Sequence, residues 1–105
     1  MIKFNRGDVV IVDLSMAAKT RPCVVIAACP DHRRNMSVVI PLTTEIRGGE
    51  CEATFRRPAW LNQDSVVNVL GIAGVDNAKV IRHIAPFPAT DFEKVLAATA
   101  EMLGL

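Results

Sequence analysis

Two short runs of the sequence each place a chemically capable side chain beside a β-branched apolar segment. Arg21 opens the run RPCVVI at residues 21–26, and Thr43 and Thr44 close the run PLTT at residues 41–44. The guanidinium group of an arginine is permanently charged and presents five N–H donors in a planar fork that fits a phosphate. A neighbouring hydroxyl can donate to the same phosphate or to an attacking oxygen. Held side by side by two strands, these groups would form a phosphodiester site that needs no metal.

The same residues also fit an ordinary structural role. Arginine and threonine are common at strand ends, so Arg21 could be a strand-end charge and the two threonines plain strand residues. The spacing along the chain leaves both interpretations open.

Length and composition predict one domain spanning residues 1–105. The chain has 105 residues and is 50% hydrophobic, which is enough to build a core without disulfides. No apolar run approaches the roughly 20 residues of a membrane helix. Residues 1–6 turn polar at once, unlike a signal peptide. We therefore expect a cytoplasmic protein with no membrane segment.

Cysteine and histidine usage predicts no metal site. Cys23, Cys29 and Cys51 lack the close pair spacing of zinc and redox motifs, and only His32 and His83 could add to them. We interpret the cysteines as reduced thiols, as is usual in the cytoplasm, and expect neither a metal nor another cofactor.

The formal net charge of +1 is uninformative, but the basic residues are clustered. Arg33 and Arg34 form one cluster, Arg47 follows the threonine pair, and residues 56–57 are both arginine. Such clusters could line a groove for nucleic acid, or they could be solvated loop charges. With one Trp, four Phe and no Tyr, the chain is a poor candidate for binding that relies on stacked bases.

Short Val- and Ile-rich runs bounded by turn residues predict the strands of a mainly β fold. They cover residues 8–14, 22–28, 37–42, 50–55, 64–70 and 80–84. Residues 48–49 are both glycine and predict a hairpin turn. Thr90 and Glu93 fit a capping box, and a helical apolar stripe then runs to Gly104. We predict a small curved antiparallel sheet or open barrel with a C-terminal helix.

Pro41 interrupts the third predicted strand. Because proline has no N–H to give to a ladder, the strand should bulge there or lie at an edge. A bulge would re-aim Thr43 out of the sheet.

These features together resemble the MazF/PemK family of bacterial toxin endoribonucleases. The family's landmarks occur in order over nearly the whole chain: Arg6-Gly7-Asp8, Val12-Asp13-Leu14, Arg21-Pro22, Pro41-Leu42-Thr43-Thr44, Asp64-Ser65-Val66-Val67 and Leu103-Gly104-Leu105. The resemblance implies an SH3-like, CcdB-type fold. It also implies a homodimer that cleaves single-stranded RNA without metal and is silenced by a small antitoxin protein.

Carried over from the family, the catalytic arginine falls on Arg21 and the catalytic threonine on Thr43. Fixed positive charge and a hydroxyl donor suit the negative charge that develops when a ribose 2′-hydroxyl attacks a phosphate. Proton transfer would rest on Arg21 or water, since no carboxylate is placed by the sequence. The substrate-binding candidates around this pair are Lys19, Thr20, Arg33, Arg34, Thr44 and Arg47.

Three departures from the family pattern favour a different class of function. The loop before Arg21 is reduced to residues 15–20, Asn68 and Leu70 replace strand charges of some relatives, and residues 71–74 read GIAG. The alternative is a catalytically degenerate fold-mate that binds nucleic acid or a protein target without cleavage, as CcdB-type poisons bind gyrase. An SH3-like interaction module would require a groove lined by aromatic residues, and the absence of tyrosine argues against one. The toxin endoribonuclease is our leading hypothesis.

Overall fold

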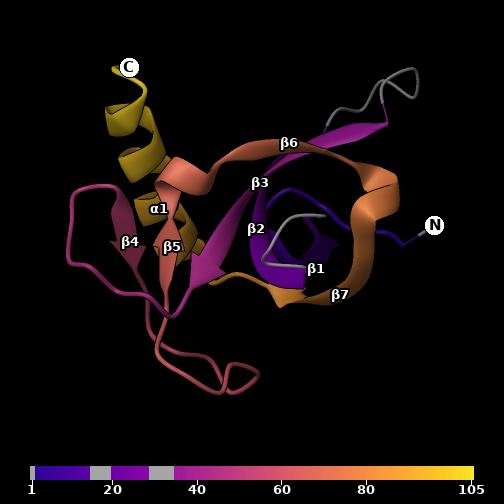
Figure 1. The fold of residues 1–105 in the computed structure, drawn as a ribbon, viewed down its shortest axis with the longest axis horizontal. Coiled ribbons are helices and arrows are strands. Elements are labelled where there is room, and N and C mark those ends of the chain that lie inside the picture. The colour runs from indigo at the N-terminus through magenta and orange to yellow at the C-terminus, as the bar shows by residue number, and fades with distance from the viewer. Residues whose placement is uncertain (1, 15–19, 29–34) are drawn as a thin grey trace.

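The Val- and Ile-rich runs form an antiparallel sheet with one helix beside it, in a computed structural model that describes residues 2–14, 20–28 and 35–105 (Figure 1). The strands are β1 (Asp8–Asp13), β2 (Thr20–Ala28), β3 (Met36–Thr43), β4 (Glu52–Thr54), β5 (Val66–Asn68), β6 (Ala73–Asp76) and β7 (Val80–Pro86). Two 3-10 turns, η1 (Val69–Gly71) and η2 (Asn77–Lys79), flank β6, and the helix is α1 (Ala89–Met102). The predicted mainly β fold with a C-terminal helix is confirmed.

The sheet is strongly curved and does not close. Its strand order is β4-β5-β3-β2-β1-β7, and β6 pairs with the first half of β3. In Figure 1, β1, β2, β3, β6 and β7 curve into a ring, while β4, β5 and α1 lie together at its side. None of the helices in the described residues is long and apolar enough to cross a membrane.

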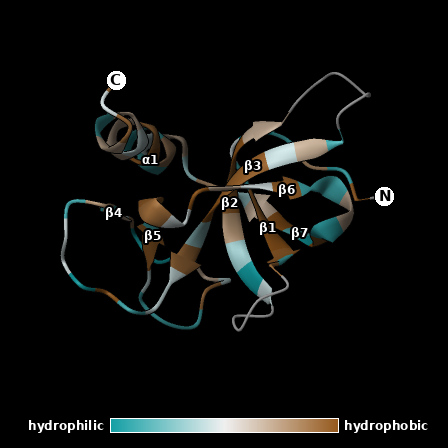
Figure 2. Cartoon of the chain, turned by 45° about the horizontal axis from the view of Figure 1, so that its top comes forward, coloured by the Kyte–Doolittle hydropathy of each residue, from teal (hydrophilic) through white to brown (hydrophobic). Residues whose placement is uncertain are grey.

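The two faces of the strands bury two separate cores, because successive strand residues point to opposite faces. Hydrophobic colour in Figure 2 is concentrated on the strands, whereas η2 is hydrophilic. The helix-side core contains Val9, Val24, Ile40, Leu42, Ala53, Val67, Phe87, Phe92 and Val95. The ring core contains Val10, Val12, Cys23, Val25, Val39 and Val80.

Pro41 lies where β3 changes its neighbour. β3 pairs with β6 through residues 36–39 and with β5 through residues 42–43, so Pro41 is locally at an edge. The predicted bulge is absent here, since Pro41 pairs in register with Cys23. The bulge falls instead on β2 at Ile26, whose carbonyl accepts a hydrogen bond from Arg6 Nε at 3.1 Å.

Gly71 allows η1 to pack directly on Pro41. A Cβ at Gly71 would lie 2.6 Å from Pro41 Cγ, closer than real side chains approach. Any side chain here would therefore push η1 away from β3, the strand that ends at Thr43.

Several sequence predictions about elements are wrong in detail. Gly48 and Gly49 do not form a hairpin turn, because β5 lies between β3 and β4 in the sheet. β4 and β5 are shorter than predicted, and β6 was not predicted at all, since its sequence AGVD has a single β-branched residue. The capping box is also wrong: α1 begins at Ala89 with Pro88 as N-cap, so Thr90 already lies inside the first turn.

The predicted helix end is confirmed. Gly104 adopts a φ of 76°, which glycine tolerates without strain. The N–H of Gly104 donates to Glu101 O at 3.1 Å, and the N–H of Leu105 donates to Ala100 O at 2.9 Å. This pair of bonds is the Schellman arrangement that terminates helices.

Candidate functional site

Strand register brings Arg21 and Thr43 to the same place. Arg21 pairs with Val12 on β1, and β2 pairs with β3 through Cys23 and Pro41. Continued by two residues on each strand, that register sets Arg21 opposite Thr43. Directly opposite residues of antiparallel strands share one face, with Cα atoms about 4.5–5.5 Å apart. Both residues are half-buried, and this placement makes the pair our candidate site.

Arg21 extends the row of residues that fills the ring core. Its neighbours on that face are Val12 and Cys23, both fully buried. Burial raises the pKa of the Cys23 thiol to about 12, and the nearby positive charge of Arg21 lowers it in part. The thiol therefore stays neutral at physiological pH. A charge with apolar neighbours on one side is less screened than one in water, so Arg21 can act strongly on an anion beside it.

The Thr43 side chain is fixed by the loop that follows β3. Thr43 Oγ1 accepts a hydrogen bond from the N–H of Glu45 at 3.1 Å. One lone pair is thereby engaged, and the hydroxyl keeps its proton as a donor. Across the strand, Thr43 pairs with Val66 of β5. Thr43 thus lies on β3, between β5 and β2, the strand that carries Arg21.

Glu45 is a carboxylate beside Thr43 that the sequence analysis missed. Its Oε2 lies 3.3 Å from Arg47 Nη2, and the two side chains are 75% and 81% exposed. Exposed pairs of this kind contribute little and open readily. The available sequence signal was the spacing Thr-x-Glu, in which a threonine hydroxyl can accept the N–H of the second residue after it.

The loop that carries Arg47 is held by the carboxylate of Glu52. Glu52 Oε2 accepts the N–H of Arg47 at 3.0 Å, and Oε1 accepts the N–H of Gly48 at 2.9 Å. Gly48 has a φ of 74°, a conformation that favours glycine. The arginine backbone is thus held while its side chain reaches into solvent.

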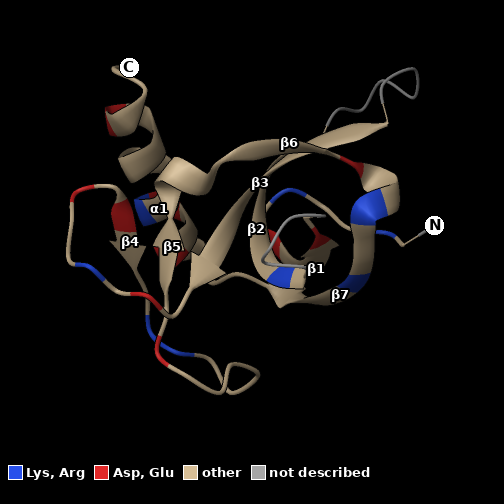
Figure 3. Ribbon diagram, viewed as in Figure 1, with Lys and Arg blue, Asp and Glu red and all other residues tan. Residues whose placement is uncertain are grey.

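The other predicted contact residues divide into two groups. Thr20 lies at the start of β2 opposite Asp13, and Thr44 directly follows β3, both exposed and near the same end of the sheet as Arg21. Lys19, Arg33 and Arg34 lie outside the described residues. Acidic and basic residues both occur on the loops beside β4, whereas β7 carries basic colour alone (Figure 3).

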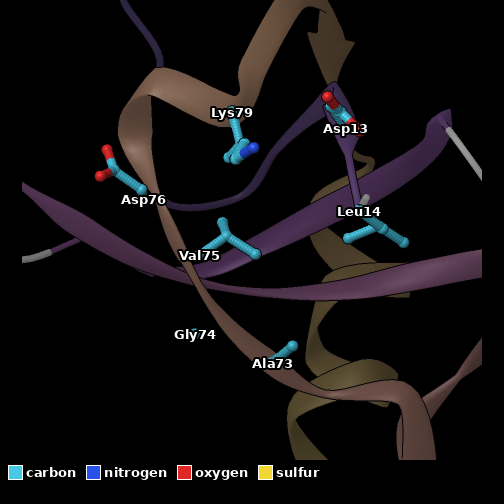
Figure 4. Close-up of a pocket in the computed structure, with 7 residues that line it drawn as sticks. All are labelled: Asp13, Leu14, Ala73, Gly74, Val75, Asp76 and Lys79. Atoms are coloured by element: carbon cyan, nitrogen blue, oxygen red, sulfur yellow. The ribbon is translucent and has the colours of Figure 1, made fainter. Parts of the chain in front are cut away.

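A cavity of about 320 Å³ lies between the end of β1 and the segment formed by β6 and η2. Its lining residues are labelled in Figure 4: Asp13, Leu14, Ala73, Gly74, Val75, Asp76 and Lys79. A second cavity, of about 240 Å³, is mostly apolar and lies beside β2, β3 and Gly74. In the described part of the chain, no three His, Cys, Asp or Glu residues gather as a metal site would require.

Known structures share this fold. MazF from Deinococcus radiodurans superposes with a TM-score of 0.82 at 20% identity over 100% of both chains. An endoribonuclease from Mycobacterial species, solved with its cognate antitoxin, superposes with a TM-score of 0.81 at 21% identity over 98% of this chain and 97% of that one. Mycobacterium tuberculosis toxin MazF-mt6 superposes with a TM-score of 0.76 at 22% identity over 93% of this chain and 97% of that one. At these identities the likeness establishes the fold alone.

Comparison with curated proteins gave no match. The model of one protein family, however, matches residues 5–103 and thus almost the full length. The chain therefore belongs to the PemK-like, MazF-like toxins of type II toxin–antitoxin systems.

Proposed function

We propose that this protein is a toxin endoribonuclease that cleaves single-stranded RNA without a metal ion. The observation that carries the proposal is the register that sets Arg21 opposite Thr43 on one face of the sheet. A guanidinium and a hydroxyl at neighbouring positions provide charge and a directed donor for one phosphate. Family membership supports the same activity.

The reaction is an attack by a ribose 2′-oxygen on the adjacent phosphorus. The new bond closes a 2′,3′-cyclic phosphate, and the bond from phosphorus to the 5′-oxygen of the next nucleotide breaks. Arg21 faces the phosphoryl oxygens, where negative charge grows in the transition state. Thr43 donates to one of these oxygens and orients the phosphate.

Glu45 is our candidate for the proton acceptor. Its backbone N–H is bonded to Thr43 Oγ1, and its exposed carboxylate lies 3.3 Å from Arg47 Nη2. In this step the carboxylate takes the proton of the 2′-hydroxyl, and the departing 5′-oxygen takes a proton from solvent. Proton transfer by Arg21 or water, as the family resemblance implied, stays the alternative.

The partners follow from family membership. Solved neighbours include a MazE–MazF complex from Deinococcus radiodurans and the Mycobacterial endoribonuclease with its antitoxin. We propose that this chain likewise forms a homodimer and binds a small antitoxin with an acidic segment, which would meet Arg21 and Arg47. Light scattering that gives a dimer mass supports the first part. Antitoxin binding that is unaffected by charge reversal at Arg47 contradicts the second.

A second function, RNA binding without cleavage, is favoured by one local feature. Asn68 lies in β5 opposite Glu52 and offers a neutral amide where some relatives carry a charge. Incubation of the purified protein with single-stranded RNA in EDTA separates the two functions. We expect cleavage that chelator does not diminish, whereas retention of intact RNA would favour the binder.

A further inference from the structure

The loop between β3 and β4 carries the proposed proton acceptor, Glu45, but contains no strand residue of its own. It spans residues 44–51, and residues 44–50 are all exposed, so packing against the core does not hold them. A group that transfers a proton must nevertheless lie within hydrogen-bond reach of its target. The loop therefore depends on polar contacts for its position.

The start of this loop is tied to the end of β3. The N–H of Glu45 donates to Thr43 Oγ1 at 3.1 Å, and the N–H of Ile46 donates to Thr44 O at 3.1 Å. These two bonds hold the backbone of Glu45 but do not fix its side chain. A third contact, at 3.3 Å from Arg47 Nη2, orients the Glu45 carboxylate. The direction of that carboxylate thus depends on the position of Arg47.

Arg47 is in turn held by Glu52, at the far end of the loop. One carboxylate oxygen of Glu52 accepts the N–H of Arg47 at 3.0 Å, and the other accepts the N–H of Gly48 at 2.9 Å. Hydrogen bonds to an ionised acceptor are roughly twice as strong as those between neutral groups. Because the two donors belong to successive residues, the carboxylate restrains both the position and the orientation of the backbone between them.

Glu52 itself is supported by paired strands. It is the first residue of β4, is half-buried and pairs with Asn68 of β5. Before it, Cys51 O accepts the N–H of Val69 at 3.0 Å, and after it, Ala53 is buried in the helix-side core. Groups held by strands are placed more precisely than groups held by loops alone. Glu52 thus passes the rigidity of the sheet to the loop.

We propose that Glu52 is a positioning residue for the cleavage reaction. Its carboxylate holds the backbone of Arg47, and the guanidinium of Arg47 holds the carboxylate of Glu45 near Thr43. Glu52 acts through these residues and contacts none of the reacting atoms. The inference rests on the proposed function, in which Glu45 accepts the proton of the 2′-hydroxyl.

The first test is amide hydrogen exchange, followed by NMR, and it needs no cleavage. The N–H groups of Arg47 and Gly48 should be protected in the wild type. Glu52→Ala should reduce that protection by about tenfold, because hydrogen bonds to a charged group are lost. Glu52→Gln keeps one acceptor oxygen and should give an intermediate value. Glu50→Ala removes an exposed carboxylate of the same loop and is the matched control, with protection as in the wild type. Equal protection in Glu52→Ala and wild type overturns the proposal.

The second test is a double-mutant cycle on cleavage. Glu52→Ala should lower the single-turnover rate at saturating RNA by about tenfold, because the proton acceptor is misplaced. RNA affinity should stay equal or rise, since a negative charge is removed, and Glu52→Gln should recover part of the rate. In the Glu45→Gln background the further loss should be about twofold or less, because the group that Glu52 positions is already absent. An undiminished loss in that background shows a structural effect unrelated to Glu45 and refutes the positioning role.

The two tests separate this inference from the proposed function. Wild-type cleavage that is unchanged in Glu52→Ala overturns the positioning role and leaves the nuclease standing. Absence of cleavage by the wild type overturns the nuclease and, with it, the catalytic part of the inference. Loss of amide protection in Glu52→Ala would then still support Glu52 as the anchor of the loop.

Discussion

Arg21 and Glu45 both lie beside Thr43, but the molecule holds them in different ways. Arg21 belongs to a paired strand, next to the fully buried Cys23. Glu45 belongs to a loop, and its side chain is 75% exposed. A group that must meet charge in the transition state gains from a fixed position, because no reorganisation is needed during the reaction. In the proposed reaction, the strand supplies the fixed charge and the loop supplies the proton acceptor.

The largest effect is expected from the strand-held charge. Arg21→Ala should lower the cleavage rate by about 100- to 1,000-fold, the usual loss for a transition-state donor. Arg21→Lys should lose less, because lysine keeps the charge but not the planar fork. Single-turnover cleavage of RNA measures the rates. Arg82→Ala on β7 is the matched control, and a loss there equal to that of Arg21→Ala would contradict a specific role.

The loop-held carboxylate should have the next largest effect. Glu45→Gln should lower the maximal rate by about 100-fold, the lower range for general acid–base catalysis. RNA affinity should stay equal or rise, since a negative charge near phosphates is removed. Glu50→Gln removes the same charge elsewhere in this loop and should retain activity; a faster Glu45→Gln enzyme would refute proton transfer.

The packing of η1 against Pro41 of β3 can be disrupted at Gly71. Gly71→Ala places a Cβ against Pro41, and overpacking of this kind costs about 1–3 kcal/mol of unfolding free energy. Denaturant unfolding measures it. Gly49→Ala meets nothing within 4 Å and should be neutral. Equal stability of the two variants would show that η1 does not press on β3.

The smallest effects concern the two threonines. Thr43→Ala should reduce the rate by about tenfold or less, because a neutral donor contributes about 1 kcal/mol. Thr44→Ala should matter least, since Thr44 lies past the end of β3 and is exposed. Cleavage rates of the two variants, measured in parallel, decide which loss is larger. A greater loss in Thr44→Ala would place the working hydroxyl one residue later.

The central strands were predictable from sequence because their runs of β-branched residues are bounded by turn residues. β6 escaped prediction because AGVD carries little of that signal. The glycine pair at 48–49 suggested a hairpin, but strand order depends on contacts between distant segments, and β5 lies between the two candidates. Local patterns also failed at Thr90, because Pro88 is the N-cap and the helix begins at Ala89.

The candidate site was only partly predictable. Residue type and the family resemblance singled out Arg21 and Thr43. Their placement opposite each other on neighbouring strands, however, depends on a register that no short motif encodes. Glu45 depends on one hydroxyl-to-backbone bond. Asp13 and Lys79 are far apart in sequence and line one cavity because the sheet curves into a ring. Long-range geometry, rather than residue type, was the missing information.

Analysis of the RNA ends left by the wild-type protein in EDTA tests the account most directly. The substrate is a short single-stranded RNA, compared with a copy in which the residue before the cut lacks its 2′-hydroxyl. The account predicts 2′,3′-cyclic phosphate and 5′-hydroxyl ends from the RNA and no cut at the 2′-deoxy position. Cleavage at the 2′-deoxy residue, or 5′-phosphate ends, would contradict attack by the ribose hydroxyl at Arg21 and Thr43.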